Sequence, residues 1–246
     1  MRVVASAAEL LELSSDDVFV RGSLRRAFVR AWAHGSAIAW VGLDAEEQRS
    51  AVCVLSTNPR DGAELVAAIR DEVHWSEAQM TLERPIAPLL DAFGLVLSAP
   101  EEWELRWTSK SAEVDLTGDL RWVDDEGQIN ALLDAHAPHS SARPGDRHVR
   151  RWAGGFLGTE LVAVAADTTG TPDIGHISSV ATSTPYRGAG WAAQVTGWLT
   201  QQLLDEGLDA VSLGMFAANT AAIRLYTRLG FTGMRQFVSG RLEHSV

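Results

Sequence analysis

The stretch TPYRGAGWAAQ (residues 184–194) combines a proline turn, one arginine, two glycines and the start of a helix. The segment before it, IGHISSVAT (174–182), has the β-branched and apolar content of a buried central strand. The segment after it places Trp191, Val195 and Leu199 on one helical face. A strand, a glycine-rich turn and a helix in this order form a recurrent arrangement for binding phosphate groups.

Residues 187–192, here called the glycine turn, have the chemistry that an anion requires. The first N–H groups of a helix have no partner inside the helix, and the helix dipole places partial positive charge at the same end. Glycines allow the backbone to approach a ligand closely, and an arginine offers a bidentate partner for phosphate oxygens. The binding groups would be Arg187, Gly188, Ala189, Gly190 and the N–H groups of Trp191 and Ala192.

The glycine turn alone leaves a second interpretation open, in which the glycines only make a tight turn. The sequence has no Gly-Lys-Ser/Thr ending, which excludes a nucleotide P-loop. It also lacks the three-glycine fingerprint of dinucleotide-binding folds. A second motif is needed to decide between a turn and a binding site.

That second motif is Asn-x-x-Ala-x-x-Leu-Tyr-x-x-x-Gly-Phe, formed by Asn219, Ala222, Leu225, Tyr226, Gly230 and Phe231. Together with Arg187-x-x-Gly190-x-Ala192 after a strand, it resembles the GCN5-related N-acetyltransferase (GNAT) family. The resemblance extends in element order over residues 119–237 and is densest over 180–231. It implies an α/β (α+β) fold, in which a mixed central sheet is flanked by helices.

The resemblance also implies a reaction. The acyl donor would be acetyl-CoA, and the acceptor would be a primary amine of a small molecule or a peptide. The glycine turn would bind the pyrophosphate, and the pantetheine arm would pair like an extra strand with the backbone of Val180, Ala181 and Thr182. N–H groups at that strand edge would polarise the thioester carbonyl. No metal is expected.

The resemblance assigns a catalytic role to Tyr226, at the position of the family's general acid for the departing thiolate. The alternative is a core aromatic residue. Asn219 would cap its helix, contact the pantetheine, or do both. The general base is left open between water and His176, which lies in the central strand. Glu160 and Asp173, at predicted turns, are weaker candidates.

The polar, turn-rich segment 109–119 predicts a domain boundary, with one domain over 1–112 and the acetyltransferase-like domain over 113–246. In the first domain, the segment LRRAFVRAWA (24–33) has helical spacing and predicts a helix.

The first domain repeats the order of strand, proline turn, glycine and helix. The segment 50–69 corresponds in this order to 178–195. Asp61 occupies the corresponding turn and the second glycine is missing, so an anion would be repelled there. The first domain is therefore either a degenerate GNAT-like domain, giving two tandem domains, or an unrelated α/β domain.

The composition of the chain limits the partners and the cellular location that the protein can have. The formal net charge of −11 without a basic run argues against nucleic acid as a partner. Cys53 is the only cysteine, so no intrachain disulfide is expected, and no stretch approaches the length of a membrane helix. We expect a cytoplasmic protein without membrane partners; a homodimer is left open.

Three histidines lie close together in a segment that is expected to be a loop. His136, His139 and His148 are interpreted as solvated loop histidines, with a metal site as the alternative.

Overall fold

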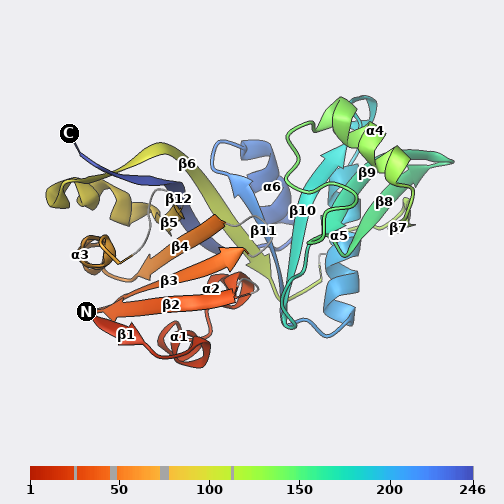
Figure 1. Cartoon of the computed structure of the whole chain (residues 1–246). Helices are drawn as coiled ribbons and strands as arrows, with labels where there is room; N and C mark the ends of the chain where they lie inside the picture. The colour runs from red at the N-terminus through yellow and green to blue at the C-terminus, as the bar shows by residue number, and fades with distance from the viewer. Residues whose placement is uncertain (25–26, 45–48, 73–77, 112–113, 246) are drawn as a thin grey trace. The chain divides into compact units, whose positions relative to one another are not determined.

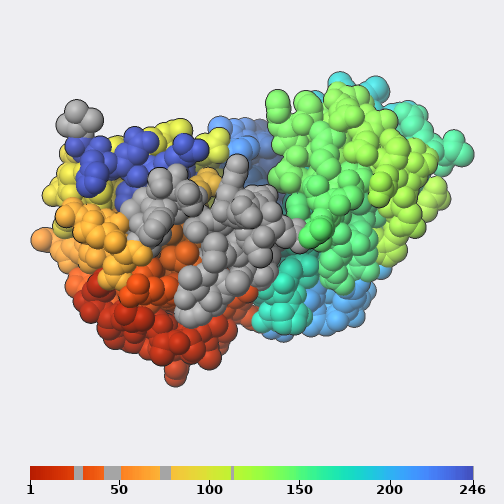
Figure 2. Space-filling model, in the orientation of Figure 1, coloured from red at the N-terminus to blue at the C-terminus, as the bar shows by residue number. Residues whose placement is uncertain are grey.

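The computed structural model describes residues 1–24, 27–44, 49–72, 78–111 and 114–245 (Figure 1); the remaining residues are drawn in grey in Figure 2. The chain forms two compact units. Unit 1 comprises Met1–Leu105, Phe216–Ala218 and Arg235–Val246, and unit 2 comprises Arg106–Met215 and Asn219–Met234. The expected boundary after residue 112 lies outside the described residues. The final segment of the chain belongs to unit 1, whereas the expected division assigned it to the second domain.

The strands of unit 1 follow the order β1-β2-β3-β4-β5-β12-β6 in a mixed sheet. The pair β4–β5 is parallel, and the pairs β1–β2, β2–β3, β3–β4 and β5–β12 are antiparallel. The elements of unit 1 are β1 (Arg2–Val4), α1 (Ala7–Leu13), α2 (Val18–Ser23), β2 (Ala27–His34), β3 (Ala37–Asp44), β4 (Arg49–Ser56), α3 (Pro59–Ile69), β5 (Ala78–Glu83), the 3₁₀-helix η1 (Arg84–Phe93), most of β6 (Leu95–Thr108) and most of β12 (Gly233–His244).

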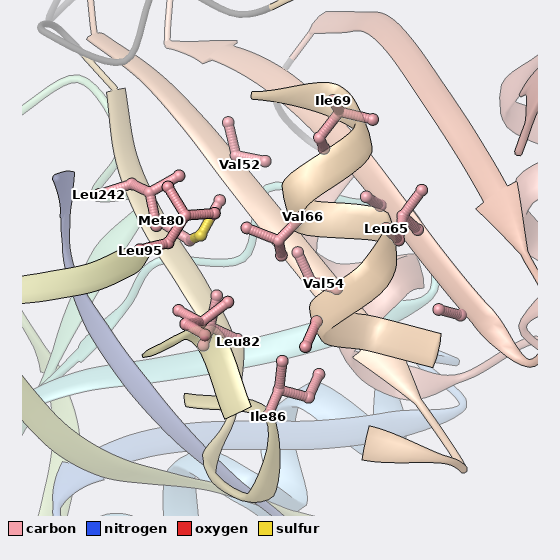
Figure 3. Close-up of a cluster of buried hydrophobic side chains, with 14 of the residues drawn as sticks. Val52, Val54, Leu65, Val66, Ile69, Met80, Leu82, Ile86, Leu95 and Leu242 are labelled. Carbon is pink, nitrogen blue, oxygen red and sulfur yellow. The ribbon is translucent and has the colours of Figure 1, made fainter. Parts of the chain in front are cut away.

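The core of unit 1 lies between the sheet, α3 and η1. Val52 and Val54 project from the same face of β4 because side chains alternate along a strand. They pack against Val66 of α3, and β5 and η1 complete the cluster with Leu82 and Ile86 (Figure 3). All five side chains are buried.

The predicted helix over 24–33 is wrong: residues 27–34 form strand β2, and residues 25–26 lie outside the described part. Ala31, Trp32 and Ala33 are all buried although they follow one another. Successive strand residues point to opposite faces, so both faces of β2 are covered here. Such a strand lacks the polar–apolar alternation that identifies strands in a sequence, and its pattern imitates a helix.

The strands of unit 2 follow the order β7-β8-β9-β10-β11 in a mixed sheet, with a parallel β10–β11 pair and antiparallel pairs elsewhere. This is the expected fold class. Its elements are β7 (Asp119–Val123), α4 (Glu126–His136), β8 (Arg151–Leu157), β9 (Glu160–Asp167), β10 (Ile174–Thr182), the 3₁₀-helix η2 (Thr184–Tyr186), α5 (Trp191–Asp205), β11 (Ala210–Phe216) and α6 (Thr220–Arg228).

Strand β9 shows how the helices of unit 2 cover the sheet. Ala163 and Ala165 join a buried cluster with residues of α5, whereas Val164 and Ala166 join a cluster with residues of α4. Because alternate residues face opposite sides of a sheet, α4 and α5 lie on opposite faces. Both faces of this sheet are therefore buried, and the site must form at its edges and strand ends.

The two halves of the chain share one order of elements. The N-terminal half runs β1, α1–α2, β2, β3, β4, α3, β5, η1, β6, and the C-terminal half runs β7, α4, β8, β9, β10, α5, β11, α6, β12. The parallel pair also falls at the same place, β4–β5 in unit 1 and β10–β11 in unit 2. The N-terminal half thus has the strand–helix order that a duplication requires.

Candidate active site

Strand β10 leaves its parallel neighbour before it ends. Its pairing with β11 runs from Ile174 to Ile177, whereas the strand continues to Thr182. The pairing with β9 shifts register between Ser178 and Ala181, which marks a bulge. Ser179 has a φ of 49°, the left-handed conformation that a serine rarely adopts. The end of β10 is therefore bent by a local irregularity of its own.

The side chain of Ser179 holds this irregularity in place. Its Oγ accepts a hydrogen bond from the N–H of Ala142 at 2.8 Å and donates to the carbonyl of the same residue at 3.2 Å. Ala142 is fully buried, so these bonds attach the loop after α4 to the strand. The sequence gives no sign of this role, because Ser-Ser in a strand carries no motif.

The end of β10 presents backbone groups at the edge that β11 leaves. The N–H of Ser183 donates to the carbonyl of Val162 in β9 at 2.9 Å. Backbone groups of successive strand residues point in alternate directions, so Val180 and Thr182 direct theirs away from β9. Ala181 is paired with β9. Of the three expected pantetheine partners, Val180 and Thr182 offer the outward N–H and C=O groups.

The glycine turn has an open backbone. Gly188 has a φ of 80° and Gly190 a φ of 86°, and no described atom lies within 4 Å of a Cβ added at either position. Gly190 is the N-cap of α5, and no side chain caps this helix within the described structure. The N–H groups of Trp191 and Ala192 therefore begin an uncapped helix next to open space. This is the arrangement that accommodates an anion.

Arg187 is oriented by backbone carbonyls. Its Nε donates to the carbonyl of Thr182 at 3.3 Å, and its Nη2 donates to the carbonyl of His136 at 2.8 Å. Of the five guanidinium N–H donors, these described bonds use two, which leaves donors for phosphate oxygens. The side chain is exposed, so it is accessible to a ligand.

Glu160, in the β8–β9 hairpin, contacts the residue that precedes the glycine turn. Its Oε2 accepts a hydrogen bond from the hydroxyl of Tyr186 at 2.8 Å. This bond raises the pKa of Tyr186 above its usual value. Glu160, considered as a base from the sequence, has a structural partner here. The other carboxylate candidate, Asp173, precedes the first residue of β10, at the end of the strand remote from Thr182.

Trp191 anchors the start of α5 through its side chain. A Cβ added at Gly118 would stand 2.6 Å from this indole, and one added at Gly155 would stand 2.9 Å from it. Trp198, two turns further along α5, packs edge-on against Trp122, with ring centroids 4.8 Å apart. The bulk of Trp191 is thus directed into the sheet, and its backbone remains at the turn.

Helix α6 carries the second motif. Asn219 is its N-cap, and the Oδ1 of Asn219 accepts from the N–H of Ala222 at 3.1 Å. Tyr226 is 7% exposed and its ring centroid lies 5.9 Å from that of Phe231. Burial raises the pKa of Tyr226 to about 12. Tyr226 is thus a core aromatic residue that keeps its phenolic proton at neutral pH.

His176 lies in β10 with its Nδ1 2.9 Å from the Oγ of Ser212, a hydroxyl that also contacts the carbonyl of Gly175 at 3.0 Å. The imidazole, considered as a base from the sequence, therefore has a hydrogen-bond partner in β11.

His136 has a role that the sequence did not reveal. It ends α4, is half-buried and hydrogen-bonds to Ser183 and Thr184, so it is not a solvated loop histidine. No spacing rule connects the end of a helix with a turn some 48 residues later. In the part of the chain that the structure describes, no group of three or more His, Cys, Asp or Glu residues is placed to hold a metal ion.

The corresponding turn of unit 1 is filled by side chains. Asn58 caps α3 by accepting from the N–H of Arg60 at 3.1 Å. Asp61 accepts from the N–H and the hydroxyl of Ser36 at 2.8 and 2.9 Å, and these bonds lower its pKa. A Cβ added at Gly35 would stand 2.3 Å from the Asp61 carboxylate. This helix N-terminus is capped and carries a negative charge, unlike that of α5.

Comparison with known proteins agrees with this geometry. Residues 116–231 match the model of the Acetyltransferase (GNAT) family. The chain therefore contains a GNAT-family acetyltransferase domain over these residues, which supports acyl transfer as the general activity. No curated protein matches the chain significantly. No helix in the described ranges is long and apolar enough to cross a membrane.

Solved structures share the fold over nearly the whole chain. A GCN5-related N-acetyltransferase from Kribbella flavida is similar with a TM-score of 0.58 and 17% identity, covering 97% of this chain and 96% of that one. A protein described as a GNAT-family acetyltransferase from Novosphingobium aromaticivorans gives a TM-score of 0.57 and 20% identity, covering 94% of this chain and 100% of the other. At these identities the likeness shows the fold, and it includes both units.

Proposed function

We propose that unit 2 is an N-acetyltransferase that moves the acetyl group of acetyl-CoA to a primary amine of a small molecule or peptide. The main observation behind the proposal is that two structural features occur next to each other in the chain. An uncapped helix N-terminus with two left-handed glycines directly follows a strand whose end has left its parallel neighbour. One elongated ligand with phosphates at one end and a strand-like arm fits both features.

The donor would be held by groups of two kinds. The glycine turn offers the N–H groups of Trp191 and Ala192, with Arg187 as the adjacent cation. The outward backbone groups of Val180 and Thr182 would pair with the amides of the pantetheine arm. Asn219 uses its Oδ1 as a cap, so its Nδ2 is the atom proposed to contact the donor.

Acetyl-CoA supplies an activated thioester: the amine nitrogen bonds to the carbonyl carbon, the carbon–sulfur bond breaks, and the thiolate takes a proton. We assign that proton to Tyr226, whose phenol is neutral at physiological pH. The amine must lose a proton, and His176 or water would accept it. The N–H groups at the β10 edge would stabilise the charge that develops on the carbonyl oxygen.

Unit 1 is proposed to be a degenerate GNAT-like domain without a donor site. The order of elements in the N-terminal half repeats that in the C-terminal half, which supports duplication. Its helix α3 is capped by Asn58, and the Asp61 carboxylate occupies the turn. A phosphate at this position would meet negative charge and no uncapped N–H group, so one chain would bind one donor molecule.

A second candidate function is a silent acyl-CoA-binding module that regulates a partner. The near-complete burial of Tyr226 favours this alternative, since a core aromatic residue needs no catalytic role. Release of CoA against a panel of primary amines, amino acids and peptides separates the two. If the chain is an enzyme, we expect turnover on at least one amine and a loss of about 100-fold in kcat for Tyr226→Phe. Donor binding without turnover on any amine would support the silent module.

A further inference from the structure

The last turn of α4 is joined to the entry of the glycine turn by one residue, His136. Its Nδ1 lies 3.3 Å from the backbone N–H donor of Thr184 and 3.0 Å from the Oγ1 of the same residue. Its Nε2 lies 3.2 Å from the Oγ of Ser183. Its backbone carbonyl accepts from Nη2 of Arg187 at 2.8 Å. Both ring nitrogens and the main chain of one residue therefore contact the segment that leads to the phosphate-binding groups.

These contacts define the state of the ring. A backbone N–H only donates, so Nδ1 must accept from Thr184. The proton of the neutral ring is then on Nε2, which donates to the Oγ of Ser183. Because His136 accepts a hydrogen bond with Nδ1 and donates one with Nε2, it holds the chain at two successive residues, Ser183 and Thr184. Ser183 is itself buried, so its contact with Nε2 is shielded from solvent.

We propose that His136 is a positioning residue for donor binding: it holds the turn at residues 183–187 so that Arg187 and the start of α5 meet the pyrophosphate together. This inference rests on the proposed function, because it assigns the ligand of the turn as acetyl-CoA. His136 itself does not touch the donor.

The expected effect follows from preorganisation. Without the imidazole, the turn gains freedom that donor binding must remove, and that ordering weakens affinity. The carbonyl of His136 remains in any variant, so His136→Ala leaves both carbonyl contacts of Arg187 in place. We expect His136→Ala to raise the Kd for acetyl-CoA about tenfold, equivalent to one or two lost hydrogen bonds.

Three variants make the test specific. His136→Ala removes all three ring contacts, whereas His136→Asn retains an acceptor close to the position of Nδ1 and is expected to recover most of the affinity. His139→Ala is the matched control, because His139 is an exposed histidine three residues further along. Thermal melting checks that all three variants fold.

Two kinetic readouts separate positioning from general destabilisation. In His136→Ala the KM for acetyl-CoA is expected to rise about tenfold while the KM for the amine and kcat change less than twofold. With acetyl-pantetheine, which lacks the pyrophosphate, His136→Ala and the wild type are expected to perform equally. An equal rise of KM with acetyl-CoA and with acetyl-pantetheine would overturn the inference that His136 positions the groups that bind the pyrophosphate.

A measurement without ligand distinguishes failure of the inference from failure of the proposed function. Amide hydrogen exchange over residues 183–190 is expected to be faster in His136→Ala than in the wild type and unchanged in His139→Ala. Unchanged exchange, with wild-type affinity for acetyl-CoA, would overturn the inference. If the wild type itself bound no acetyl-CoA, the proposed function would be refuted, and the exchange rates alone would decide whether His136 fixes the turn.

Discussion

The indole of Trp191 lies directly over the backbone of Gly155, where an added Cβ would stand 2.9 Å from its Cε3 atom. Trp191 begins α5 and Gly155 lies in β8, so this contact seats the helix that carries the glycine turn onto the sheet. The absence of a side chain at Gly155 is what permits the close approach. The bulky Trp191 at the turn is thus accommodated because Gly155, far away in the sequence, has no side chain.

Gly155→Ala is therefore expected to destabilise the protein by about 1–3 kcal/mol through overpacking. In a Trp191→Leu background the same substitution should cost much less, because the indole is gone. Urea unfolding of the four proteins in this cycle measures the coupling. Additive costs would show that the two residues do not share a contact.

A second prediction compares two glycines of α5 that have the same backbone conformation. Gly190, before the helix, has a φ of 86°, and Gly207, after it, has a φ of 91°; a Cβ at either would meet no described atom within 4 Å. Alanine at either position should cost about 1 kcal/mol of stability, from the left-handed backbone alone. Only Gly190→Ala should also weaken acetyl-CoA binding in calorimetry, since Gly207 lies at the other end of the helix. Equal affinities for the two variants would argue against a donor at the glycine turn.

A third prediction concerns the pH dependence that Tyr226 confers. Burial raises its pKa to about 12, whereas in the unfolded chain the pKa is near 10. The folded chain holds the proton more tightly, so this contribution to stability is complete below about pH 10 and is lost as the pH rises towards 12. Two pKa units correspond to about 3 kcal/mol.

The measurement is the free energy of unfolding of the wild type and of Tyr226→Phe between pH 9 and pH 12. The chain has only two tyrosines, so absorbance near 295 nm follows their ionisation directly. The wild type should lose stability relative to Tyr226→Phe across this window. Parallel curves for the two proteins would mean that Tyr226 titrates normally.

A fourth prediction separates strain from hydrogen bonding at Ser179. Its φ of 49° is unfavourable for any side chain, and its Oγ makes two bonds to Ala142. Ser179→Ala keeps the strain and loses the bonds, so it should destabilise by about 1–3 kcal/mol. Ser179→Gly loses the same bonds but relieves the strain, so it should cost about 1 kcal/mol less. Chemical denaturation measures the free energy of unfolding of the two variants. A Ser179→Gly variant that is no more stable than Ser179→Ala would contradict the prediction.

Much of unit 2 could be predicted from the sequence because its signals are local. The bounds predicted for the central strand, 174–182, are those of β10, and Asn219 caps α6 as expected. Caps, glycine turns and apolar periodicity depend on a few neighbouring residues, which a single sequence displays. The resemblance to the GNAT family implied an α/β fold with a mixed sheet, and the glycine turn has the open backbone that its motif indicates.

What could not be predicted depends on distant contacts. Strand β2 is covered on both faces, so its sequence resembles a helix. The role of His136 arises from a turn 48 residues away, and the partner of Trp191 is a glycine in another strand. The final segment, Arg235–Val246, joins unit 1, and its pairing with β5 is a long-range choice that no local pattern encodes. The acceptor amine leaves no local pattern either.

The central claim, that unit 2 alone binds acetyl-CoA at the glycine turn, is tested most directly by isothermal titration calorimetry of the whole chain. We predict one acetyl-CoA bound per chain, binding abolished by Arg187→Glu, and wild-type binding in Arg241→Glu, an exposed residue of unit 1 that gives the same change in charge. Two donors per chain, or undiminished binding by Arg187→Glu, would contradict the account.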